Sequence, residues 1–182
     1  MSGQVGFYIN SEGCYGCQTC QVACMSEQKT APGVSWRRVR QLDTNNPPSH
    51  VNISMACNHC QDPQCLLNCP AGAYTRLENG IVYQDHAKCL GCRMCTYACP
   101  YGAPQYDPVE KKVSKCSYCK ERVEQGLMPR CAEACPGGNI IVGDLAELEA
   151  RYQGVREIPG ITPKAEVTKP SILINPAKPH KN

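Results

Sequence analysis

Cysteine is the residue whose number and spacing in this chain indicate chemistry. Sixteen of the 182 residues are cysteines, and their spacing divides them into four groups of four with none left over. The groups are Cys14, Cys17, Cys20 and Cys24; Cys57, Cys60, Cys65 and Cys69; Cys89, Cys92, Cys95 and Cys99; and Cys116, Cys119, Cys131 and Cys135. In every group three residues separate the last two cysteines, and in groups two, three and four a proline follows directly. This internal repeat predicts four related cofactor-binding segments.

Groups one and three have the spacing C-x2-C-x2-C-x3-C, which suits a cubane cluster of four irons. Each iron of such a cluster takes one thiolate, a soft ligand. The loop of residues 14–20 can place three thiolates around three irons, but the next cysteine points elsewhere. In two-cluster ferredoxins this fourth cysteine ligates the other cluster. We therefore expect Cys24 to bind a different cluster from the one that Cys14, Cys17 and Cys20 share.

A four-cysteine zinc site is the main alternative, and residues 57–60 (CNHC) have the spacing of half such a site. Zinc sites do not call for the repeated C-x2-C-x2-C run or for a proline after the fourth cysteine, so the pattern favours iron–sulfur clusters. His59 lies in this segment, and because all four cysteines of its group are present, we expect it in the loop or beside the cluster rather than as a ligand. The other three histidines belong to no ligand pattern.

The composition argues against several other functions. One Phe and one Trp cannot form a large aromatic core, so inorganic clusters are expected to fill part of the interior. Four oxidised clusters with their thiolates carry roughly −2 each, which changes the formal net charge from +3 to about −5 and removes the case for a nucleic-acid partner. There is no glycine-rich nucleotide-binding motif and no spare cysteine nucleophile, so we expect no catalytic site on this chain.

The N-terminal residues and the hydropathy bear on location. The first residues, MSGQVGFYIN, lack the basic, apolar and twin-arginine segments of export signals, which also argues against a secreted, disulfide-linked protein. No apolar run reaches the roughly 18–20 residues that cross a bilayer. The sequence therefore predicts neither an export signal nor direct membrane insertion.

Short elements are expected around the cysteine groups. Strands are predicted over residues 6–10, 51–55 and 139–144, and a hairpin is predicted around Asn79 and Gly80. Short helices that begin inside the cysteine loops are predicted over residues 18–28, 93–99 and 118–125. Residues 144–153 are expected to form a surface helix with Asp144 as its N-cap and an apolar face of Leu145, Leu148 and Tyr152.

The last segment, residues 158–182, is rich in proline and lysine and shows no periodicity. Two interpretations fit this pattern about equally well: a disordered tail, or an extended arm that lies across a partner. The apolar stretch at residues 171–174 (SILI) favours the arm.

Three segments resemble a known family: residues 57–73 (CNHCQDPQCLLNCPAGA), 89–106 (CLGCRMCTYACPYGAPQY) and 115–136 (KCSYCKERVEQGLMPRCAEACP). They are similar to the four-cluster iron–sulfur subunits of molybdopterin oxidoreductases, above all to the dimethyl sulfoxide reductase electron-transfer subunit. The resemblance implies an α+β fold of two interlocked bacterial-ferredoxin-like halves, with short helices and small antiparallel hairpins around four clusters.

The resemblance also divides the chain and assigns the cysteines. It implies a first half of residues 1–56 and 100–157, a second half of residues 57–99, and an extended tail of residues 158–182. Four [4Fe–4S] clusters would be held by Cys14, Cys17, Cys20 and Cys135 (first cluster); Cys24, Cys116, Cys119 and Cys131 (second); Cys57, Cys60, Cys65 and Cys99 (third); and Cys69, Cys89, Cys92 and Cys95 (fourth).

The function that the resemblance implies is electron transfer rather than catalysis. Single electrons would pass between a quinone-reactive membrane anchor subunit, or another donor, and a molybdopterin (bis-guanine-dinucleotide) catalytic subunit, as in anaerobic respiration. The chain would lie on the extracytoplasmic face of the cytoplasmic membrane, exported with the twin-arginine signal of a partner, or else in a cytoplasmic complex. A free-standing soluble polyferredoxin is the alternative function, and the long segment between groups one and two argues against it.

Overall fold

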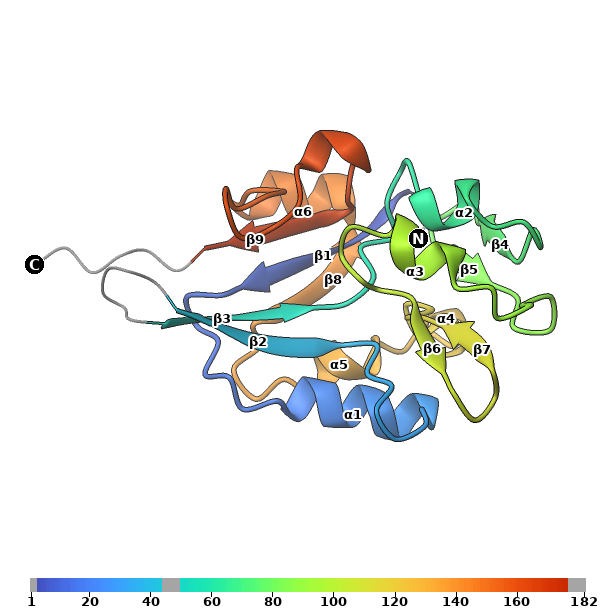
Figure 1. The fold of residues 1–182 in the computed structure, drawn as a ribbon. Helices are drawn as coiled ribbons and strands as arrows, with labels where there is room; N and C mark the ends of the chain where they lie inside the picture. The colour runs from blue at the N-terminus through green and yellow to red at the C-terminus, as the bar shows by residue number, and fades with distance from the viewer. Residues whose placement is uncertain (1–2, 44–49, 177–182) are drawn as a thin grey trace, which may run out of the picture.

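The computed structural model describes residues 3–43 and 50–176, which form a small mixed fold of short helices and short strands (Figure 1). The helices are α1 (Thr19–Gln28), α2 (Gln64–Leu67), α3 (Met94–Ala98), α4 (Lys120–Glu124), α5 (Arg130–Glu133), α6 (Leu145–Arg151) and the 3-10 helix η1 (Ala165–Val167). The strands are β1 (Val5–Asn10), β2 (Arg38–Asp43), β3 (His50–Met55), β4 (Tyr74–Arg76), β5 (Val82–Gln84), β6 (Gln105–Asp107), β7 (Lys112–Ser114), β8 (Ile140–Asp144) and β9 (Ile172–Asn175). Within the described residues, no helix has the length and apolar character that crossing a membrane requires.

The three-stranded sheet joins distant parts of the chain, in the order β8–β1–β9. β1 runs antiparallel to β8 and parallel to β9, so the strand that follows the fourth cysteine group lies beside the first strand. In each strand of this sheet, successive side chains point to opposite faces. Phe7, Ile9 and Ile174 belong to the core that contains cysteines, whereas Tyr8 and Leu173 pack with α6 on the other face.

The C-terminal segment differs from both interpretations of the sequence. Residues 172–175 form β9, which pairs with β1 along its whole length. Ile172, Leu173 and Ile174 are all at most 5% exposed. The expectation of a disordered tail or of an arm for a partner is therefore wrong for this stretch, because its apolar side chains fill both faces of the chain's own sheet. The end of the predicted tail, residues 177–182, lies outside the described residues.

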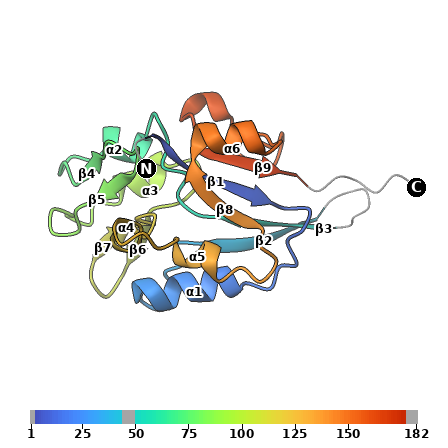
Figure 2. The same ribbon diagram turned by 180° about the vertical axis from the view of Figure 1, so that it is seen from behind.

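Three two-stranded hairpins complete the described sheets: β2–β3, β4–β5 and β6–β7. The predicted turn at Asn79 and Gly80 joins β4 to β5, and Gly80 has a φ of 79°, which glycine adopts without steric cost. The strand β2 and the β6–β7 hairpin were not predicted. Together with α2 and α3, the hairpins β4–β5 and β6–β7 gather at one end of the molecule, on the right in Figure 1 and on the left in Figure 2.

The predicted helices of the cysteine loops and the predicted helix α6 are confirmed. α1, α3 and α4 each begin within or directly after a run of closely spaced cysteines. Asp144 caps α6, because its Oδ1 accepts a hydrogen bond from the amide of Ala146 at 2.9 Å. The apolar face of α6 packs on the sheet, and the ring of Tyr152 stacks on Tyr8 with the centroids 4.4 Å apart. The division into two interlocked halves stays a prediction.

Candidate iron–sulfur cluster sites

The four cysteines of the first set line one small pocket. Cys14, Cys17 and Cys20 line it from the loop that leads into α1, and Cys135 lines it from the segment after α5. The structure thus brings the last cysteine of group four to the first three cysteines of group one. Cys17 is exposed, so this site reaches the surface.

The four cysteines of the second set line another small pocket. Cys24 lines it from α1, together with Cys116, Cys119 and Cys131 of group four. Cys24 lies four residues after Cys20 on the same helix but faces a different cavity, and it is only 4% exposed. Groups one and four therefore exchange their last cysteines in space.

The third and fourth sets show the same exchange between groups two and three. One small pocket is lined by Cys57, Cys60, Cys65 and Cys99. In the fourth set the main cause that raises the pKa of the Cys95 thiol is burial, and its neighbours Cys89, Cys69 and Cys92 raise it further. Cys92 is exposed, so this set also reaches the surface.

All four sets join three thiols of one group with one thiol of another. In each of these three pockets, four thiols line one small, largely apolar space. Among the described residues, no three or more His, Cys, Asp or Glu side chains are placed to hold a single metal ion. The thiols line cavities rather than converge on one point, and their role as ligands stays a prediction.

Backbone conformation explains how the loops of groups one and three curl. Gly16 and Gly91 have φ values of 71° and 70°, and two residues later Gln18 and Arg93 have φ values of 59° and 63°. A Cβ atom on Gly91 would lie 2.1 Å from the carbonyl oxygen of Lys111, so this position requires glycine. Repeated left-handed residues turn amide groups toward a concave surface, and such surfaces bind anionic groups, iron–sulfur clusters included.

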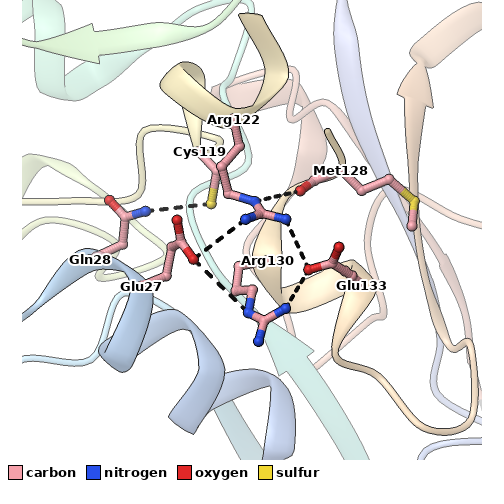
Figure 3. A network of polar contacts seen from close by, with 7 residues as sticks. All are labelled: Glu27, Gln28, Cys119, Arg122, Met128, Arg130 and Glu133. Atoms are coloured by element: carbon pink, nitrogen blue, oxygen red, sulfur yellow. Dashed lines mark hydrogen bonds and ion pairs between the residues drawn. The ribbon is translucent and has the colours of Figure 1, made fainter. Parts of the chain in front are cut away.

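Hydrogen bonds to sulfur recur in these segments. Four backbone amides donate to cysteine Sγ atoms: Ala73 to Cys69 (3.4 Å), Asn139 to Cys135 (3.3 Å), Val113 to Cys89 (3.4 Å) and Tyr118 to Cys116 (3.4 Å). At the end of α1, Gln28 Nε2 donates to Cys119 Sγ at 3.5 Å (Figure 3). Hydrogen bonds to sulfur are one of the factors that set the reduction potential of an iron–sulfur cluster.

An ion-pair network holds α1 against the segment of group four (Figure 3). Arg122 of α4 and Arg130 of α5 approach the carboxylate of Glu27 in α1, at 3.6 and 4.0 Å. Both arginines also contact the Glu133 carboxylate of α5, Arg122 at 2.9 Å. The network fixes the helix that carries Cys24 beside the loop that carries the other cysteines of the second set.

The buried thiols need a positive partner to ionise. Burial, more than any neighbour, raises the pKa of the Cys24 and Cys60 thiols to about 12, and it raises the pKa of Cys116 well above its ordinary value. At exposed Cys17, by contrast, a hydrogen bond from Thr19 lowers the thiol pKa. Bound iron supplies the positive charge that keeps cysteines as thiolates. Sets of four thiols around compact, largely apolar cavities therefore fit iron–sulfur clusters.

His59 is a residue of the core. It is 1% exposed, its Nδ1 accepts the amide of Val82 at 3.1 Å, and its ring stands edge-on to Tyr118. Burial, and then the charge of Lys115, hold its pKa well below the usual range, so it is neutral at physiological pH. His59 does not line the third cavity, although its neighbours in sequence do.

Two buried cations at the sites escaped the sequence analysis. Lys115 is 3% exposed, lines the third cavity and donates to the carbonyl oxygen of Cys116 at 3.0 Å. Arg37 is 1% exposed and lines the second cavity. No pattern separates them from exposed neighbours such as Arg40, because each stands among other polar residues. Only the folded structure shows that Lys115 and Arg37 lie beside the cysteines.

Comparison with known proteins agrees with this geometry. A family model described as a 4Fe-4S dicluster domain matches residues 49–145. One chain of the anaerobic dimethyl sulfoxide reductase of Escherichia coli is 39% identical over 186 residues, which cover 97% of this chain and 90% of the relative. A tetrathionate reductase subunit of Salmonella typhimurium is 37% identical and covers 79% of this chain and 59% of the relative. A sulfite dehydrogenase subunit of Allochromatium vinosum is 30% identical, and the match covers 85% of this chain and 75% of the relative. The chain therefore belongs to the family of 4Fe-4S dicluster subunits that includes this dimethyl sulfoxide reductase chain, as its cysteine segments predict.

Proposed function

We propose that this chain is the electron-transfer subunit of an oxidoreductase complex and relays single electrons through four [4Fe–4S] clusters. Each of the three relatives described above is named as one chain or one subunit of a reductase or dehydrogenase, so the free-standing polyferredoxin is set aside. The observation that carries the proposal is the exchange of last cysteines between groups. The pockets that three of the four sets line support it, and the fourth set is proposed by the same exchange.

Each set is the proposed ligand set of one cluster. The sets are Cys14, Cys17, Cys20 and Cys135; Cys24, Cys116, Cys119 and Cys131; Cys57, Cys60, Cys65 and Cys99; and Cys69, Cys89, Cys92 and Cys95. When bound, a cluster supplies a centre that gains and loses one electron. The protein's own contribution is to hold four thiolates, to donate hydrogen bonds to sulfur, and to exclude water from the buried second and third sites.

The exposure of the cysteines supports a proposal for the two ends of the relay. Cys17 and Cys92 are the two exposed cysteines, one in the first set and one in the fourth, whereas every cysteine of the second and third sets is at least half-buried. Electrons that enter or leave the chain at its surface would therefore use the first and fourth clusters. The second and third clusters would connect them through the interior.

Large apolar side chains stand exposed beside both ends. Tyr15 and Val22 are 77% and 63% exposed and lie within five residues of Cys17 in the sequence. Leu90 and Tyr97 are 75% and 81% exposed and lie within five residues of Cys92. Exposed apolar residues that gather at one place mark surfaces which other proteins cover. We assign the molybdopterin catalytic subunit to the first end and a quinone-reactive membrane subunit to the fourth.

The complex is proposed to lie on the extracytoplasmic face of the cytoplasmic membrane, exported with the twin-arginine signal of the catalytic partner. A cytoplasmic complex is the alternative. Protease added to intact spheroplasts should degrade this chain if it faces outward. Survival of the chain until the cells are lysed would place it in the cytoplasm.

The ligand sets are tested by four Cys→Ser variants of the purified holoprotein. Serine replaces a soft thiolate with a harder oxygen, so the affected cluster should shift its potential or lose one iron. Cys135→Ser and Cys17→Ser should alter one electron paramagnetic resonance (EPR) signal, and Cys24→Ser and Cys119→Ser should alter a second. If Cys24→Ser changes the signal that Cys17→Ser changes, the proposed sets are wrong.

A further inference from the structure

Arg37 is a buried charge whose hydrogen bonds all end on neutral groups. It precedes β2, is 1% exposed, and takes part in no ion pair among the described residues. Its Nη1 donates to the carbonyl oxygen and to the hydroxyl of Ser54, at 3.3 and 3.1 Å, and its guanidinium lies over the ring of Phe7. Its Nε has no hydrogen-bond partner. A buried guanidinium needs compensating negative charge, and none of these contacts supplies it.

The sulfur atoms around Arg37 are the groups that can supply that charge. Burial lowers the pKa of its guanidinium, but the surrounding thiols, first Cys131 and Cys116 and then Cys20 and Cys24, outweigh burial and raise it. Cys20 belongs to the first set, and the other three belong to the second. Arg37 therefore lines the second site and also lies near a thiol of the first.

Ser54 of β3 connects Arg37 to the first site. Its hydroxyl lies 3.4 Å from Cys20 Sγ, and Ser54 lines the first cavity, whereas Arg37 lines the second. Ser54 Oγ already accepts a hydrogen bond from Arg37. When Cys20 is a thiolate it has no proton to give, so the Ser54 hydroxyl must donate to its sulfur. The order of the link is then Arg37 to Ser54 to Cys20.

We propose that Arg37 and Ser54 form a polar link that sets the reduction potentials of the first and second clusters together. Arg37 acts on both clusters through its charge, and Ser54 acts on the first cluster through its hydrogen bond. Reduction adds one negative charge to a cluster, so a nearby cation and a donor to sulfur both stabilise the reduced form and raise its potential. The inference rests on the proposed ligand sets.

The test is an anaerobic potentiometric titration of the holoprotein followed by EPR. The signals of the first and second clusters are assigned with the Cys17→Ser and Cys119→Ser variants. Arg37→Gln should lower both midpoint potentials, each by a tenfold change in the one-electron equilibrium or more, which is 59 mV. Ser54→Ala should lower the first potential and leave the second unchanged. Arg40→Gln is the matched control, because Arg40 lies in β2 and carries the same charge but is exposed.

Each outcome decides the question. Unchanged potentials in Arg37→Gln and Ser54→Ala, or equal shifts in Arg37→Gln and Arg40→Gln, would overturn the link. If Arg37→Gln does not assemble clusters, the midpoint potential of the first cluster in Ser54→Ala is the deciding measurement. A lower potential supports the link, and an unchanged potential overturns it. If the wild-type holoprotein shows no signals that follow the two cysteine sets, the ligand sets themselves fail, and the link fails with them.

Discussion

The role of β9 as a core strand predicts that Ile174→Ala destabilises the holoprotein strongly. Ile174 is 1% exposed and belongs to the same core as Phe7 and Ile9 of β1. Replacing a buried isoleucine with alanine removes about 2–5 kcal/mol from the free energy of unfolding, because transfer and cavity terms add. That loss is a large part of the roughly 5–15 kcal/mol that holds a typical domain together.

Urea denaturation under anaerobic conditions measures this effect. The free energy of unfolding falls by about 2 kcal/mol per molar urea, so the urea midpoint of the variant should be lower by roughly 1–2.5 M. Unfolding is monitored by the visible absorbance of the clusters and by circular dichroism. Ile161→Ala is the matched control, because Ile161 lies in the same predicted tail but is 44% exposed. Its effect should stay within about 0.5 kcal/mol. Equal midpoints for the two variants would refute the assignment of β9 to the core.

Two further predictions concern the clusters. If all sixteen cysteines are ligands, the holoprotein should contain about sixteen irons and sixteen sulfides with no free thiol, whereas iron analysis at half this value or a disulfide would contradict the four sets. Removal of iron should leave the chain largely unfolded, because α2 and α3 are single turns and metal binding is folding free energy in such small sites. A cooperative thermal transition without iron would speak against this reasoning.

The cysteine spacing carries most of what could be predicted about the sites. An x3 spacing places Cys24 one helical turn beyond Cys20, and the two sulfurs face different cavities. Asp144 ahead of an apolar helical pattern predicted α6, and Asn79 with Gly80 predicted the β4–β5 turn. These features are local, and local patterns can be read without knowledge of the fold.

The features that were not predicted depend on distant contacts. Ile174 stands in a short apolar run between prolines, and such a run looks the same whether it covers a partner or completes the chain's own sheet. Arg37 lies in the sequence SWRRVR, where charge is the pattern of a solvated strand. Arg37 is buried among cysteines of groups one and four. These cysteines are distant from it in the sequence, so the sequence alone does not show this contact.

The parallel pairing of β1 with β9 has a consequence for the timing of synthesis. Roughly 160 residues separate the end of β1 from the start of β9. At a translation rate of about 5–20 residues per second, β9 is therefore synthesised roughly 8–32 s after β1. The cysteines of the third and fourth sets all lie between Cys57 and Cys99, and those sets are complete on the ribosome much earlier. If the proposed ligand sets hold, the fourth and third sites can take up iron before the other two. The first site is lined by residues of β1 and β8, whose sheet closes last, so under the same proposal it should mature last.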